Sequence, residues 1–133
     1  MQNIQPVNTF SFMEQEHPVL KAELRGSPDY PDVHGEVYVY FLPNGVYLQG
    51  DFEGLPPMEQ FPFHVHEGLI CDEPGGKLLR LPDLMSDEDG DASTQIYLDR
   101  VNSTQIAGRP IMMHLHIGDN DVKLACGLLD RVL

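Results

Sequence analysis

Residues 61–67 read Phe-Pro-Phe-His-Val-His-Glu. In an extended strand, side chains two residues apart lie on the same face. His64 and His66 therefore share one face, while Phe63 and Val65 point the other way into a core. Two neutral imidazoles held close together on a stiff strand form half of a transition-metal site. This stretch predicts a β-strand with one apolar, buried face and one metal-binding face.

A second pair with the same spacing, His114 and His116, follows the apolar run at residues 110–113. A single pair is more typical of structural or surface histidines, but two pairs among only six histidines favour a metal site. If the two strands approach each other, up to four imidazoles converge, a set suited to copper, zinc, nickel or iron. The candidate metal ligands are thus His64, His66, His114 and His116.

Short runs of β-branched and aromatic residues, separated by turn residues, make up most of the chain. The expected strands lie at residues 19–25, 36–42, 46–52, 61–67, 94–98, 109–117 and 122–132. Asn44-Gly45 predicts a hairpin, and the glycines and prolines of residues 67–91 predict an irregular segment. Together they predict an all-β protein, an immunoglobulin-like Greek-key β-sandwich or barrel of about eight antiparallel strands.

The chain length of 133 residues predicts a single domain spanning residues 1–133. Residues 1–18 are polar with scattered apolar positions, so we expect a tail or an extra edge strand there. The same residues lack a basic start and an apolar signal core. A cytoplasmic location is therefore expected, unless a leader was trimmed from the chain.

The formal net charge of −13 argues against nucleic acid and anionic membranes as partners, because phosphate groups would be repelled. The chain also lacks an apolar run long enough to cross a membrane. The alternative explanation of this net charge is that it only keeps the protein soluble. An anionic substrate would need a local positive region to reach a site on such a protein.

Four segments of the chain resemble the copper/zinc superoxide dismutase family. Residues 63–67, 108–114 and 124–129 are similar to three signature segments of that family, and in the same order. Residues 89–92, Asp-Gly-Asp-Ala, are similar to the family's Asp-Gly-x-Ala turn. The resemblance covers residues 19–133 and implies the same Greek-key β-barrel with a copper site.

The resemblance implies that His64, His66 and His114 hold one copper ion. The family's bridging histidine and zinc histidines are missing here. Arg80 stands where the family has its zinc carboxylate, and a guanidinium cannot ligate zinc, so we expect no zinc site of the family type. Because Cu(II) prefers four or more donors, His116 becomes the candidate fourth ligand, although it could equally be an exposed residue at a strand end.

Two cysteines, Cys71 and Cys126, permit one disulfide. In a reducing cytosol two buried thiols are the ordinary expectation. The resemblance implies the alternative, since the family bonds a cysteine shortly after its His-x-His to one in its last strand. It also implies that Lys123 takes the place of the family's guiding arginine, keeping the charge but not the bidentate fork. We further expect Arg109 to hold a loop through main-chain carbonyls.

Two further features have a structural interpretation. Met112 and Met113 alternate across a strand, so at least one should be a core residue rather than a thioether ligand. The acidic turn at residues 86–90 lacks the further oxygen ligands and the glutamate of a calcium loop. We therefore expect no calcium site there. Asp119 and Asp121 are either turn residues or groups that orient a ligand imidazole.

The sequence thus leaves three functions open. The first is a copper-dependent, zinc-less superoxide dismutase, with superoxide as its small-molecule partner. The second is a non-enzymatic module that binds copper or another transition metal, which a site with only three imidazoles favours. The third is a structural domain without metal. The oligomeric state stays open, a homodimer included.

Overall fold

The structure is a computed structural model that describes residues 17–133. Its elements are β1 (Leu20–Gly26), β2 (His34–Leu42), β3 (Gly45–Glu53), β4 (Gln60–His66), β5 (Lys77–Met85), β6 (Ala92–Asp99), α2 (Ser103–Ile106), β7 (Pro110–Ile117), β8 (Asn120–Leu128) and β9 (Asp130–Arg131). The tail or edge strand expected at residues 1–18 falls largely outside the described residues. Within that range only His17 and Pro18 are described, and neither lies in a strand.

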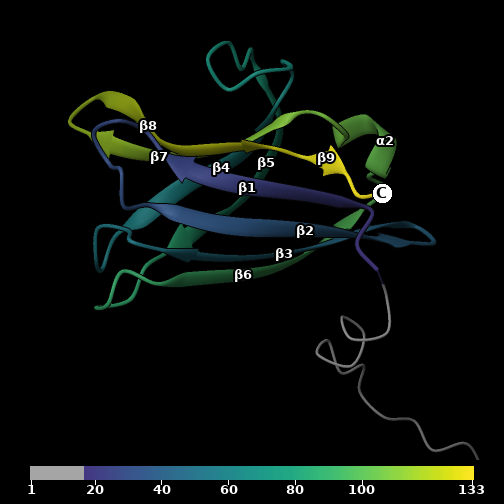
Figure 1. Ribbon diagram of the computed structural model, residues 1–133, viewed down its shortest axis with the longest axis horizontal. Helices are drawn as coiled ribbons and strands as arrows, with labels where there is room; N and C mark the ends of the chain where they lie inside the picture. The colour runs from purple at the N-terminus through teal and green to yellow at the C-terminus, as the bar shows by residue number, and fades with distance from the viewer. Residues whose placement is uncertain (1–16) are drawn as a thin grey trace, which may run out of the picture.

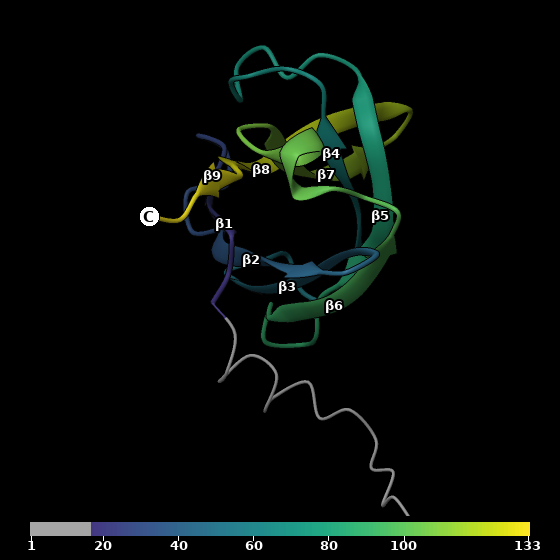
Figure 2. The same ribbon diagram turned by 90° about the vertical axis from the view of Figure 1, so that its right-hand side faces the viewer.

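The strands form one antiparallel sheet in the order β5-β4-β7-β8-β1-β2-β3-β6, with β9 pairing only with β1. The neighbours β4 and β7, β8 and β1, and β3 and β6 are not consecutive in the chain, so long connections cross the ends of the sheet. β1, β2, β3 and β6 lie on one side and β4, β7 and β8 on the other (Figures 1 and 2), with β5 curving toward β6. The predicted all-β barrel or sandwich is confirmed, as a nearly closed barrel. Within residues 17–133, no helix is long and apolar enough to cross a membrane.

The hairpin predicted between β2 and β3 is present. Leu42 pairs with Gly45, so the two turn residues are Pro43 and Asn44 rather than Asn44 and Gly45. Gly45 instead opens β3, where a Cβ atom would lie only 2.2 Å from the backbone oxygen of Leu98 on β6. Glycine at this position therefore permits the close approach of β3 to β6.

The prediction that residues 67–91 are wholly irregular is wrong, because β5 occupies nine of them. Proline normally interrupts a sheet, since it cannot donate a main-chain hydrogen bond. Pro82 is tolerated because β5 is the outermost strand of the hydrogen-bonded order and, among the strands of residues 17–133, pairs only with β4. The pairing of β4 with β5 also shifts register between Phe61 and Phe63, where β5 carries one extra residue.

The barrel interior is filled from the inward faces of the strands. On β4, Phe61, Phe63 and Val65 are fully buried in the apolar core. His64 and His66 alternate with them and so lie on the outer face of the barrel, as the sequence predicted. This alternation places the site of interest on the outside of the β4, β7 and β8 layer.

Candidate metal centre

The pairing of β4 with β7 brings three imidazoles together. His64 of β4 lies directly opposite Met112 of β7. His66 lies two residues further along β4 and His114 two residues further along β7, and because the strands are antiparallel these two steps lead in opposite directions from the His64–Met112 pair. The rings of His66 and His114 nevertheless lean toward each other, since their Nε2 atoms are 3.4 Å apart. The ring centroids of the three histidines are 5.4 to 6.0 Å apart. One ligand atom from each residue falls within 4.8 Å of the others, so the group could hold a metal ion.

Hydrogen bonding decides which ring nitrogens are available to a metal. Nδ1 of His66 lies 3.1 Å from the carbonyl oxygen of Gly75. A carbonyl can only accept, so Nδ1 carries the proton and Nε2 is left as a lone-pair donor directed at His114. Nδ1 of His64 is buried, and residues 17–133 offer it no hydrogen-bond partner. A buried ring nitrogen without a partner is costly, and a bound cation would satisfy it, so the donor set fits a metal.

The electrostatics of the site keep His64 and His114 neutral. Burial, together with the charges of Lys77, His66 and Arg80, lowers the pKa of His64. Burial also lowers the pKa of His114 to about 4, reinforced by the neighbouring imidazoles of His64 and His66. A metal ligand must be unprotonated. At neutral pH both rings are therefore already in the form that binds a metal.

Three cationic side chains flank the histidines. In the ladder of β4 and β5, Arg80 lies opposite His64 and Lys77 opposite His66. On the other side, Lys123 of β8 lies opposite His114, and its Nζ donates a hydrogen bond of 2.7 Å to the carbonyl oxygen of Cys71. The sequence predicted positive charge from Lys123 and Arg80, but it did not single out Lys77. Only recognition of β5 as the partner of β4 could have shown its place.

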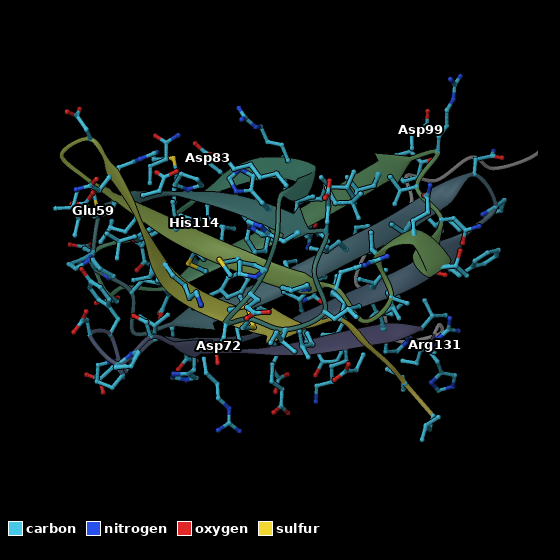
Figure 3. All side chains as sticks on the ribbon, turned by 90° about the horizontal axis from the view of Figure 1, so that it is seen from above. Glu59, Asp72, Asp83, Asp99, His114 and Arg131 are labelled. Carbon is cyan, nitrogen blue, oxygen red and sulfur yellow. A yellow bond between two sulfur atoms is a disulfide. The ribbon has the colours of Figure 1, made fainter. Side chains whose placement is uncertain are left out.

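A loop, residues 67–76, arches over this face of the barrel (Figure 1). The predicted disulfide between Cys71 and Cys126 is confirmed, and it ties the loop to β8. Arg109 donates a hydrogen bond to the carbonyl oxygen of Glu67, which confirms the loop-holding role expected for it. Seen from above, His114 lies between Asp83 of β5 and Asp72 of the loop (Figure 3).

His116, the fourth candidate ligand, does not join the three-histidine group. Because β4 and β7 are antiparallel, moving from His114 to His116 leads about 7 Å further from the His64–Met112 pair. His116 is exposed at the end of the hairpin of β7 and β8 and forms an ion pair with Asp121 when protonated. Spacing alone could not reveal this, since both histidines lie in one strand. Asp121 is thus the ion-pair partner of His116. Its negative charge also raises the pKa of His114, against the larger lowering by burial.

Another group of potential oxygen ligands in the described part of the chain is Asp87, Asp89 and Asp91 at the acidic turn. Oδ1 of Asp87 accepts hydrogen bonds from the main-chain nitrogens of Asp89 and Asp91, each 2.9 Å long. All three side chains are exposed. These contacts explain the cluster as a turn held by its own side chain.

Comparison of the chain with protein-family models gives no match, and comparison with curated proteins gives none either. The likeness to the copper/zinc superoxide dismutase family therefore rests on the four quoted segments and stays a prediction.

Proposed function

We propose that the protein binds one copper ion through His64, His66 and His114 and disproportionates superoxide to oxygen and hydrogen peroxide. The observation that carries this proposal is the convergence of His64, His66 and His114, one ring nitrogen of each lying within 4.8 Å of the others. It is supported by the buried Nδ1 of His64, for which residues 17–133 supply no hydrogen-bond partner. Imidazole ligands suit copper. The resemblance of the same residues to the copper ligands of a dismutase family supports copper among the metals that imidazoles bind.

Copper held by His64, His66 and His114 would supply one-electron redox chemistry between its two oxidation states, which is what the disproportionation of superoxide needs. The protein residues hold the metal and attract the anion. The chain has 21 acidic residues and only eight lysines and arginines. Three of those eight, Lys77, Arg80 and Lys123, flank the imidazoles. They provide the local positive region that an acidic protein needs for an anionic substrate.

A second candidate function is the storage or delivery of copper without turnover. It is favoured by the position of His116, because the described part of the chain then gives the site three imidazoles and no fourth. Three nitrogen donors satisfy Cu(I), whereas Cu(II) prefers four or more. A site of this kind would favour the reduced metal and slow the cycle.

The test is the rate of superoxide decay after pulse radiolysis, with copper-loaded protein compared with the metal-free form. A dismutase should approach the diffusion limit of about 10⁸ to 10⁹ M⁻¹s⁻¹. The His64→Ala variant should lose both copper and activity, while the His116→Ala variant should retain copper. A rate equal to that of the metal-free protein, with copper demonstrably bound, would exclude the enzyme and favour the second function.

The remaining proposals concern the partner, the oligomeric state and the cellular location of the protein. Superoxide is the proposed small-molecule partner, and a homodimer stays a prediction. The expected cytoplasmic location also stays a prediction. The disulfide between Cys71 and Cys126 argues for an oxidising compartment instead, since disulfides persist there and are rare in the cytosol.

A further inference from the structure

Two adjacent methionines of β7 have different environments. Met113 is fully buried and belongs to the apolar core inside the barrel. Met112 is only 1% exposed, yet it is not part of that core cluster. Since neighbouring side chains in a strand point to opposite faces, Met112 lies on the outer face, the same face as the histidines.

The register shows where Met112 lies on that face. Its partner on β4 is His64, and its partner on β8 is Cys126 of the disulfide. Side chains of directly opposite residues are neighbours, with Cβ atoms about 5 Å apart. His66 and His114 lie on either side of the His64–Met112 pair and lean together until their Nε2 atoms are 3.4 Å apart. Met112 is thus flanked by His64 on one side and by the disulfide of Cys126 on the other, and this outer-face residue is almost completely buried.

We propose that the thioether sulfur of Met112 is the fourth ligand of the metal, approaching from beneath the three imidazoles. This inference rests on the proposed copper site and deepens it. Methionine is unbranched and flexible, so its sulfur can adjust toward a bound ion. Met112 is buried but lies outside the main apolar cluster of the barrel interior, so the packing of that cluster does not account for it.

The chemistry of the sulfur sets which ion the site prefers. Thioethers are soft ligands that select Cu(I), whereas hard carboxylates and water suit ions such as magnesium and manganese. Three imidazoles with one thioether therefore form a site for Cu(I), or for Ag(I) as its redox-inert analogue.

The experiment uses full-length protein labelled with selenomethionine, reduced with ascorbate and loaded with one equivalent of copper. X-ray absorption at the copper edge should detect a selenium neighbour in the wild-type protein. This neighbour should disappear in Met112→Leu and persist in Met113→Leu, the matched control one residue away. Both substitutions conserve volume and should leave the fold intact, which circular dichroism and unfolding curves check.

A competition assay with a Cu(I) chelator gives the second measurement. We expect the Cu(I) affinity of the Met112→Leu variant to be lower than that of the wild type by a factor of roughly ten or more, as is typical when a metal site is disturbed. The Cu(I) affinity of the Met113→Leu variant should equal that of the wild type. Copper with imidazole neighbours but no selenium neighbour in the wild type would overturn the role of Met112 and leave the copper site standing. A selenium neighbour that survives in Met112→Leu would also overturn it. Failure to bind copper at all would overturn the proposed function itself.

Discussion

The disulfide between Cys71 and Cys126 should account for a large part of the stability of the metal-free protein. The two cysteines are 55 residues apart in the chain. Cross-linking a loop of that length restricts the unfolded chain and contributes about 4 kcal/mol in the chain-entropy model. A Cys71→Ala/Cys126→Ala double variant should therefore unfold at a temperature roughly 10–20 °C lower than the oxidised wild type.

The measurement is the free energy of unfolding from urea titrations of metal-free protein, followed by circular dichroism. The chemically reduced wild type is the matched control, because it loses the cross-link without any change of side chain. Both forms should be destabilised by similar amounts relative to the oxidised protein. A loss smaller than about 1 kcal/mol in both forms would refute the reasoning, since it would mean that the unfolded chain gains little freedom when the link is removed.

The same disulfide should support the metal site. The loop that it anchors supplies the Gly75 carbonyl that orients His66 and the Cys71 carbonyl that holds Lys123. Release of the loop should weaken metal binding by about tenfold or more, as loss of an orienting hydrogen bond does elsewhere. Equal Cu(I) affinity of the double variant and the wild type, in a chelator competition at a temperature where both are folded, would contradict this link.

The other predictions concern single residues of the site. The His114→Ala variant should lose copper binding in equilibrium dialysis, whereas His116→Ala should bind as the wild type does; loss in both would return His116 to the ligand set. The Lys123→Gln variant should show a lower rate constant for superoxide decay and a weaker dependence of that rate on ionic strength, because a charge that attracts the anion is gone; an unchanged salt dependence would argue against that role. In metal-free protein the pKa of His114 is lowered from 6.5 to about 4. Between these values the unfolded chain binds a proton that the folded protein does not, so stability should fall as the pH decreases from 6.5 toward 4. The His114→Gln variant should flatten that part of the curve of unfolding free energy against pH, and an identical slope would count against the shift.

The histidine strand could be predicted from the sequence because its information is local. Strict alternation in residues 61–67 determines which side chains are buried and which share the outer face. The turn before Gly45 and the β-type runs around it are local in the same sense. A strand such as β5 is different, because its Pro82 and its mixed pattern make sense only at the edge of a sheet and beside a bulge.

The sequence by itself determined the all-β class, the pairing of His64 with His66 on one face and, through the resemblance, the cysteine pair. The tertiary structure decided that His114 joins them and that His116 does not, because the antiparallel register of β4 and β7 sets the distance of each from His64. It also decided which cations flank the imidazoles. These contacts join strands that are distant in the chain, so they depend on the register between the strands. His114 and His116 lie two residues apart on the same face of β7, and a local sequence pattern cannot tell which of them the register places beside His64.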